Sequence, residues 1–211
     1  MHSYAVEGGD AQILPWWMLI LAAFSVGFSY LIHIVIGFEG LGLQKFTEDS
    51  SWLVGPPSAL AIFAGLYRIF DNYLWKVRFF RIMLFVSRPD LNSKWEVEIL
   101  SPPRNTQPGL AGELRVCQTW SKISITLDTN ISQSRSLTAA ITHLAPHSIK
   151  LTNEYSVDRK VEAPESLQRH VGTNQILIEV EKGKMMRLDG EYYTERNRGN
   201  YGDILFKTRL K

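Results

Sequence analysis

Two long uncharged segments near the start of the chain dominate its hydrophobic pattern. Residues 13–38 and residues 50–67 contain no Asp, Glu, Lys or Arg. As a helix rising ~1.5 Å per residue, the first segment would reach about 39 Å, more than the roughly 30 Å of bilayer hydrocarbon. The second segment is close to the lower length limit for a span, and Arg68 follows it. We therefore expect a two-helix transmembrane hairpin over residues 13–71.

After residue 94 the pattern changes to alternation of apolar and polar residues, which is typical of β-strands. The alternation is interrupted by turn residues and predicts eight strands, at 95–100, 113–120, 122–129, 134–144, 148–156, 172–181, 185–195 and 202–210. Short connections favour antiparallel neighbours, so we expect an eight-stranded antiparallel up-and-down β-barrel, with a β-sandwich as the alternative.

The alternation also predicts which side chains face the interior of the barrel. Four series share this face: Ile123, Ile125 and Leu127; Ile149, Leu151, Asn153 and Tyr155; His170, Gly172, Asn174, Ile176 and Ile178; and Leu188, Gly190, Tyr192, Thr194 and Arg196. The last three series each begin or end with polar residues. This predicts an apolar floor and a polar rim at one end, as in a ligand pocket at a barrel mouth.

Four regions follow from these patterns. We expect a cytoplasmic tail at 1–12, the transmembrane hairpin at 13–71, a juxtamembrane basic helix and linker at 72–94, and a cytoplasmic ligand-sensing barrel at 95–211. The orientation rests on basic residues near the span ends, since cytoplasmic loops carry the excess of Lys and Arg. The connector between the spans contains one, Lys45, whereas Arg68, Lys76, Arg78, Arg81 and Arg88 follow the second span. Both termini are therefore expected in the cytoplasm.

Composition excludes some classes of protein. A net charge of +2 is too small to indicate a general nucleic-acid-binding surface, so neither DNA nor RNA is an expected partner. The residues before the first span include Glu7 and Asp10 but no Lys or Arg, unlike a secretory signal peptide. The single cysteine, Cys117, cannot form an internal disulfide, and its place in an alternating run favours a buried strand position over a reactive thiol.

The sequence contains no recognisable catalytic or metal-binding motif. It lacks a Gly-rich phosphate loop before a helix, HExxH or CxxC metal spacing, and a GxSxG elbow. His143, His147 and His170 lack an orienting partner for acid–base or nucleophilic chemistry. We expect no enzyme activity, no catalytic residues, no metal and no cofactor.

The order of short motifs resembles one known family. Two predicted spans are followed by Gln118-Thr119-Trp120, Asn153-Glu154-Tyr155, His170-Val171-Gly172-Thr173 and the run from Gly190 to Arg196 with a closing Gly202. This order is similar to that of the two-transmembrane, β-barrel effectors of bacterial CBASS (CD-NTase-associated) antiphage defence. The stretch after Arg196, Asn-Arg-Gly-Asn-Tyr, departs from the family by lacking a threonine.

The resemblance implies a function for the whole chain. A partner CD-NTase would make a cyclic nucleotide on infection and the barrel would bind it. The transmembrane helices would then oligomerise and disrupt the inner membrane, killing the infected cell. The expected ligand is a cyclic dinucleotide, and the expected location is the bacterial inner membrane.

The residues also suit such a ligand on chemical grounds, since it presents phosphates, flat bases and hydroxyls. Candidates for ligand binding are Arg196 for a phosphate, with Arg198 and Arg159 less favoured; Tyr155, Tyr192 and Trp120 for stacking; and His170, Asn153, Thr173 and Thr194 for hydrogen bonds. Each has a structural alternative: the aromatic residues are also typical of a core, and Arg196 has Glu195 and Glu191 near it in the sequence as ion-pair partners.

Three other functions remain open from the sequence. A membrane-tethered lipocalin-like protein would carry a lipid or other small ligand and would need an apolar mouth. An envelope scaffold would fill its barrel with its own side chains. A membrane-bound hydrolase is the least favoured.

Overall fold

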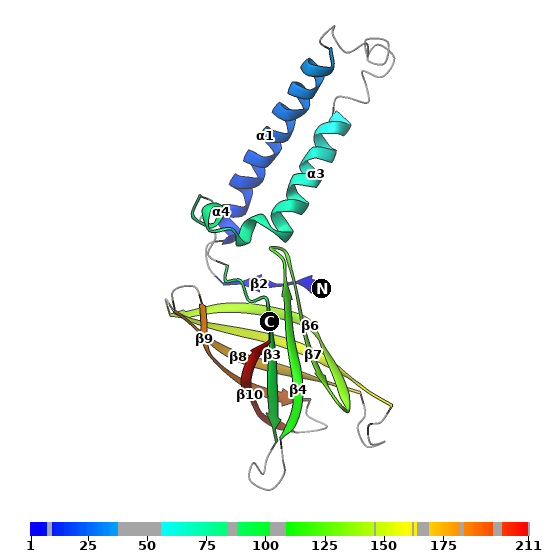
Figure 1. The fold of residues 1–211 in the computed structure, drawn as a ribbon, viewed down its shortest axis with the longest axis vertical. Helices are drawn as coiled ribbons and strands as arrows, with labels where there is room; N and C mark the ends of the chain where they lie inside the picture. Colours follow the sequence, from blue (N-terminus) through cyan, green and yellow to red (C-terminus); the bar gives the residue numbers. More distant parts are fainter. Residues whose placement is uncertain are drawn as a thin grey trace. The chain divides into compact units, whose positions relative to one another are not determined.

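The structure, a computed structural model, describes residues 1–7, 10–37, 56–83, 88–101, 109–145, 147–161, 163, 169–181, 184–195 and 200–210. The chain forms two compact units. One is Gly9–Ser87, and the other combines Met1–Gly8 with Arg88–Lys211. The first unit is helical and the second contains the β-strands (Figure 1).

Two helices form most of the first unit. α1 spans Asp10–Gly37, and α3 spans Pro56–Asn72, beginning at a proline, which is tolerated in a first helical turn. The two helices contact each other. In α1, Ser25 and Ser29 are buried, and the Ser25 hydroxyl donates a hydrogen bond of 2.7 Å to the Leu21 carbonyl. Small residues such as these allow helices to approach closely.

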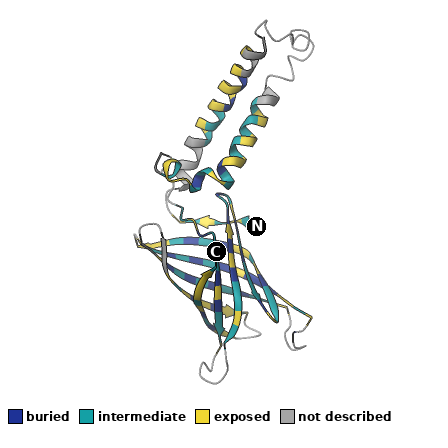
Figure 2. Cartoon of the chain, viewed as in Figure 1, coloured by how far each residue is buried: buried dark blue, intermediate teal, exposed yellow. Residues whose placement is uncertain are grey.

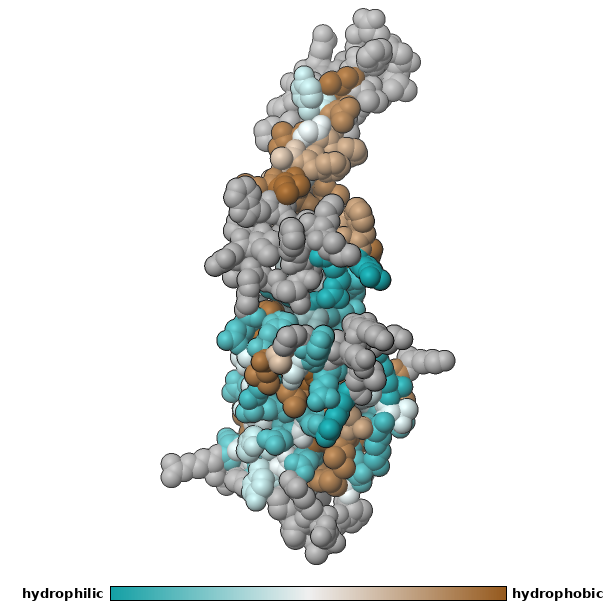
Figure 3. All heavy atoms as spheres, turned by 90° about the vertical axis from the view of Figure 1, so that its left-hand side faces the viewer, coloured by the Kyte–Doolittle hydropathy of each residue, from teal (hydrophilic) through white to brown (hydrophobic). Residues whose placement is uncertain are grey.

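The surface of the helical unit is largely apolar where the structure describes it (Figure 3). Exposed apolar side chains include Leu19, Ile20, Phe24, Leu31 and Leu60. Among the described residues, however, none of the helices is both long and apolar enough to cross a membrane. The two transmembrane spans therefore remain a prediction, and the connector between them lies outside the described residues.

The segment after α3 forms two short helical pieces, where the sequence predicted one helix and a linker. η2 is a 3-10 helix at Leu74–Lys76, and α4 is an α-helix at Arg78–Met83. The Trp75 side chain is fully buried, and the Lys76 ammonium lies 5.5 Å from the centre of its ring.

Eight antiparallel strands form the barrel of the second unit. They are β3 (Ser93–Leu100), β4 (Leu110–Gln118), β5 (Lys122–Thr129), β6 (Ser132–Ala145), β7 (Ser148–Arg159), β8 (His170–Glu181), β9 (Lys184–Thr194) and β10 (Tyr201–Leu210). Each pairs with the next along the chain, and β10 pairs with β3, which closes the sheet. The predicted up-and-down barrel is confirmed, and the sandwich alternative is wrong.

The barrel core follows the predicted alternation. Buried side chains recur at every second residue from Ile149 to Tyr155 in β7 and from Gly172 to Ile178 in β8. Figure 2 shows buried residues distributed along the strands of the barrel. The core includes Val97, Leu114, Ile123, Ile125, Ile141, Ile149, Leu151, Ile176, Ile178 and Ile204. Burial of these side chains provides the main driving force for folding of the barrel.

Two short strands before α1 complete the sheet, in the segment expected to be a tail. β1 (His2–Ser3) pairs antiparallel with β5, and β2 (Ala5–Val6) pairs parallel with β6. Direct pairing between β5 and β6 extends only over Thr126–Asp128. Residues 1–7, called here the seam segment, therefore add backbone pairing where β5 and β6 no longer pair with each other.

The expected burial of Cys117 is wrong. Leu114, Val116 and Gln118 of β4 face the interior, so the intervening Cys117 faces outwards and is exposed. Adjacent residues of a strand point to opposite faces, and the polar Gln118 occupies the inner face in place of the thiol.

Candidate functional site

A pocket of about 220 Å³ lies inside one end of the barrel. Its lining comes from the ends of β3, β5, β7 and β9 and from the starts of β4, β6, β8 and β10. The pocket therefore lies at the end where β3 connects to β4, β5 to β6, β7 to β8 and β9 to β10. Further along the same strands, core residues such as Leu151 and Ile176 provide a hydrophobic floor.

Four of the residues predicted from the sequence line this one pocket. They are Tyr155, His170, Tyr192 and Thr194. Their side chains come from three consecutive strands, β7, β8 and β9, because they share the inward-facing parity of each strand. The predicted polar rim at one end of the barrel thus corresponds to a real cluster of side chains.

The sequence did not assign a role to other polar residues of the lining. These are Ser101, Thr129, Ser132, Ser134, Asn174 and Asn200. Asn174 was placed on the interior face by alternation but not in the site. The others lie at strand ends and turns, where the period of two is interrupted and gives no facing direction.

Tyr192 is held against β10 and β3. Its hydroxyl forms a hydrogen bond of 2.5 Å with the Ser101 hydroxyl. Its backbone partner on β10 is Gly202, where a Cβ atom would come within 2.7 Å of the Tyr192 ring and would clash with the Leu100 carbonyl oxygen. Glycine at 202 therefore leaves the space that the ring occupies.

Tyr155 has a similar arrangement on the neighbouring strands. Its backbone partner on β8 is Gly172, where a Cβ atom would clash with the Tyr155 hydroxyl and lie 2.5 Å from the ring carbon Cζ. The tyrosine ring lies across the glycine. Both tyrosines are at least nine-tenths buried, so their rings belong to the barrel interior and to the pocket wall at once.

Two asparagines lie side by side next to these rings. Asn153 of β7 and Asn174 of β8 are cross-strand partners, and their exposed fractions are 1% and 3%. Asn174 lines the pocket, whereas Asn153 is enclosed. Neither the amide nitrogen nor the amide oxygen of Asn153 has a hydrogen-bond partner.

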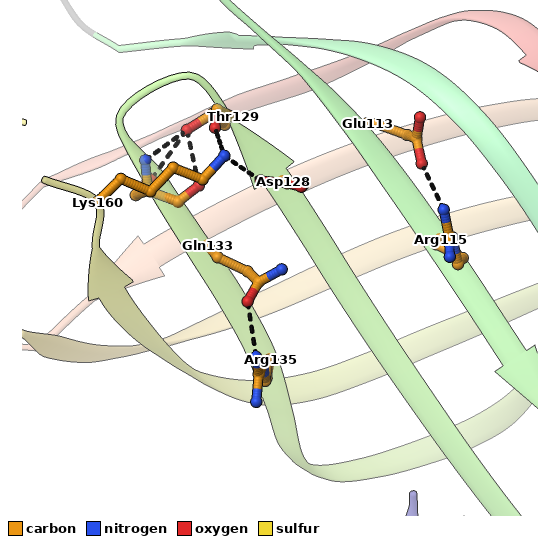
Figure 4. Close-up of polar contacts among 8 residues, drawn as sticks. Glu113, Arg115, Asp128, Thr129, Gln133, Arg135 and Lys160 are labelled. Carbon is orange, nitrogen blue, oxygen red and sulfur yellow. Dashed lines mark hydrogen bonds and ion pairs between the residues drawn. The ribbon is translucent and has the colours of Figure 1, made fainter. Parts of the chain in front are cut away.

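A lysine lies beside the rim. The Lys160 ammonium forms a 2.5 Å ion pair with Asp128 and donates a hydrogen bond to the Thr129 carbonyl, as Figure 4 shows. The backbone N–H of Lys160 also donates to the Ile131 carbonyl at 2.9 Å. Thr129 and Ile131 line the pocket and Lys160 itself does not, so its ammonium lies beside the pocket wall, where it is paired with Asp128. Alternation could not identify it, since it follows the last residue of β7.

The preferred phosphate-binding candidate, Arg196, and Arg198 lie outside the described residues. The connection that carries them starts and ends at the pocket: the Asn200 N–H donates to the Thr194 hydroxyl at 2.8 Å, and both residues line the pocket. Arg159 is described and is exposed at the end of β7, where its backbone pairs with Ser132.

Two predicted residues lie away from the pocket. Thr173 falls between the inward-facing Gly172 and Asn174, so it faces the outside of β8. Trp120 lies in the connection from β4 to β5, at the opposite end of the barrel, and is 4% exposed. The Arg88 guanidinium covers its ring at 4.3 Å and also lies 5.1 Å from the Tyr4 ring. Neither Thr173 nor Trp120 therefore joins the four predicted residues that line the pocket.

Among the described residues, two side chains on the outer surface of the barrel, Glu113 and Tyr193, have clearly shifted pKa values. The pKa of Glu113 is lowered, first by a hydrogen bond from Lys94 and also by the Arg115 guanidinium, which donates at 3.0 Å. The pKa of Tyr193 is raised because its hydroxyl donates to the Glu191 carboxylate at 2.9 Å. Neither Glu113 nor Tyr193 lines the pocket.

The pocket combines aromatic rings, amides, hydroxyls and an imidazole above an apolar floor, and the ion pair of Lys160 with Asp128 lies beside its wall. Such a set can bind a flat polar molecule with an anionic portion. In the part of the chain that the structure describes, no three His, Cys, Asp or Glu side chains are placed to hold a metal ion.

Comparison with known proteins places the chain in a family. Residues 86–208 match the family described as Cap15, cyclic dinucleotide receptor domain. The chain is also 33% identical over 156 residues to CD-NTase-associated protein 15 of Yersinia aleksiciae. This alignment covers 73% of the chain and 70% of the relative. The matched residues include all eight barrel strands up to Thr208. The resemblance to CBASS effectors is confirmed, and the chain belongs to the Cap15 family with its cyclic dinucleotide receptor domain.

Proposed function

We propose that the chain is a CBASS antiphage effector whose barrel binds a cyclic dinucleotide in the pocket inside one end of the barrel. Binding would promote association of the α1 and α3 helices of several copies, and these would disrupt the inner membrane. The observation that carries the proposal is the convergence of Tyr155, His170, Tyr192 and Thr194 on one pocket within the matched receptor domain.

The pocket offers each kind of contact that a cyclic dinucleotide needs. The Tyr155 and Tyr192 rings provide flat apolar faces for a base, since aromatic rings stack on nucleobases. Thr194 and His170 offer hydrogen-bonding groups to the sugar and the phosphates. We keep Arg196 as the preferred phosphate ligand, and a phosphate would have to displace Asp128 to bind the described cation Lys160.

The proposal includes a partner enzyme that supplies the ligand. The relative from Yersinia aleksiciae is named for its association with a CD-NTase. We infer that this chain likewise works with a CD-NTase that makes the cyclic dinucleotide. The chain itself then acts as a receptor and not as an enzyme, consistent with the receptor domain that it matches.

The direct test is calorimetric titration of the detergent-solubilised full-length protein with a panel of cyclic di- and trinucleotides. We expect saturable binding of at least one cyclic dinucleotide, and no heat from the matching linear dinucleotide. Failure of every cyclic nucleotide to bind would reject the proposal. A parallel titration with a fatty acid tests the lipocalin-like alternative, for which only the lipid would bind.

A second experiment tests the role of the pocket. Tyr192→Ala removes a pocket-lining ring and should weaken binding at least tenfold. Its matched control is Tyr193→Ala, which removes the neighbouring ring from the outer surface, where Tyr193 is 45% exposed. Equal affinities of the two variants would show that the ligand binds elsewhere.

A further inference from the structure

The amide of Asn153 is buried without a hydrogen-bond partner. Its residue is 1% exposed, and neither polar atom of its side chain reaches a protein donor or acceptor. Buried amides are nearly always hydrogen-bonded, because an unpaired amide loses its bonds to water and gains nothing in return. An amide kept at such a position therefore suggests a partner that arrives from outside the protein.

The position of Asn153 shows where such a partner would come from. Its cross-strand neighbour is Asn174, whose own partner on β9 is Tyr192, and both of these line the pocket. The next inward row, Leu151 and Ile176, is apolar and fully buried. The two amides thus lie at the boundary between the pocket and the hydrophobic floor, at the depth that an inserted group would reach last.

The size of the pocket limits what can be inserted. Its volume of about 220 Å³ is below the range of roughly 300–1,000 Å³ that is usual for sites enclosing a drug-sized ligand. A cyclic dinucleotide is larger than most drug-sized ligands, so it cannot be enclosed whole. One flat base fits this space better than the charged ring of sugars and phosphates, which would remain at the mouth.

On the basis of the proposed function, we propose that one nucleobase of the ligand enters the pocket edge first and that the Asn153 and Asn174 amides read its hydrogen-bonding edge. An amide presents a donor beside an acceptor, which complements a base with an acceptor beside a donor. Adenine has such an edge, and asparagine pairs with it in this way in protein–nucleic acid complexes. On the edge formed by N7 and the 6-substituent, adenine presents an acceptor beside a donor whereas guanine presents two acceptors, so recognition of this edge makes adenine the preferred inserted base.

The test compares full-length variants for ligand affinity and for melting temperature without ligand. Asn153→Leu keeps the side-chain volume but removes both polar atoms. We expect it to raise the melting temperature, because an unpaired buried amide is replaced by an apolar group, and to weaken binding of cyclic di-AMP at least tenfold. The control is Thr152→Val on the outward face of the same strand, which should leave affinity within twofold.

A panel with cyclic di-AMP, cyclic di-GMP and cyclic UMP–AMP tests the base preference. The wild-type protein should favour ligands that contain adenine, and Asn153→Leu should reduce this preference. If Asn153→Leu melts higher but binds with unchanged affinity, or if the wild-type protein favours cyclic di-GMP, the inference is wrong while the proposed function stands. If the wild-type protein binds no cyclic nucleotide, the proposed function fails first.

A second variant covers the case in which Asn153→Leu does not fold. Asn174→Leu keeps the approximate volume of a residue that lines the pocket and removes its hydrogen-bonding groups without adding a charge. A tenfold loss of affinity for cyclic di-AMP would support the inference. An affinity within twofold of the wild-type value would overturn it.

Discussion

Gly202 shows how closely single residues shape the pocket. A methyl group at this position would clash with the Leu100 carbonyl oxygen and would lie 2.7 Å from the Tyr192 ring. Backbone atoms cannot move aside cheaply, so either the strand pairing or the ring must shift. The position of a pocket-lining ring thus depends on a residue that has no side chain.

We predict that Gly202→Ala lowers the free energy of unfolding by about 1–3 kcal/mol, the usual cost of overpacking. Thermal unfolding of the full-length protein in detergent measures the effect. The matched control is Gly65→Ala in α3, where a Cβ atom would meet no other atom within 4 Å. Equal melting temperatures for the two variants would contradict the predicted clash.

We also predict that the hydroxyl groups of Tyr192 and Ser101 act as a pair. Tyr192→Phe and Ser101→Ala each break the 2.5 Å hydrogen bond and should each cost about 0.5–1.5 kcal/mol of stability. The double variant should cost less than the sum of the two, because the bond can be lost only once. Additive effects would show that the pair does not interact in solution.

The site could be predicted from the sequence only where alternation fixes the facing direction. Tyr155, His170 and Tyr192 were assigned correctly to the pocket wall by this rule. The same rule placed Asn174 inside, but it was not among the ligand-binding candidates. It also excludes Thr173, which lies between two inward-facing residues. Lys160 could not be identified from the sequence, because its place beside the pocket depends on contact between two connections of the barrel. The Lys160 N–H, after β7, donates a hydrogen bond to the Ile131 carbonyl, between β5 and β6.

At the scale of elements, the barrel strands were predictable and the seam segment was not. Strands of eight or more residues show a clear period of two, so their number and order followed from the sequence. β1 and β2 have two residues each, which is too short for any period. Only their partners define them as strands, and those partners lie far away in the sequence.

We predict that the seam segment stabilises the barrel where β5 and β6 do not pair with each other. The backbone N–H of Glu7 donates a 2.8 Å hydrogen bond to the Ile141 carbonyl, next to the pairing of Val6 with Ile141. Glu7→Pro removes this donor and should increase amide hydrogen exchange in residues 122–125 and 139–142. Glu7→Ala keeps the donor and serves as the control; equal exchange in both variants would show that the bond does not hold the seam.

At the scale of the whole molecule, the proposal requires that ligand binding in one unit changes the association of the other. We expect the detergent-solubilised full-length protein to elute as a larger species when a cyclic dinucleotide that binds is added. The Tyr192→Ala variant should keep the size of the ligand-free protein under the same conditions. A wild-type protein that binds ligand without any change of size would remove assembly from the mechanism while leaving recognition intact.

The seam segment has a consequence for how the helices are attached. Residues 1–7 and 88–210 belong to the same compact unit, so the helical residues between them form an insertion within the barrel domain and not an extension from one end. The insertion is joined through two tethers: one leads to the β5–β6 seam and the other to β3. Both ends of the helical insertion are therefore joined covalently to the barrel domain, one after β2 and the other before β3.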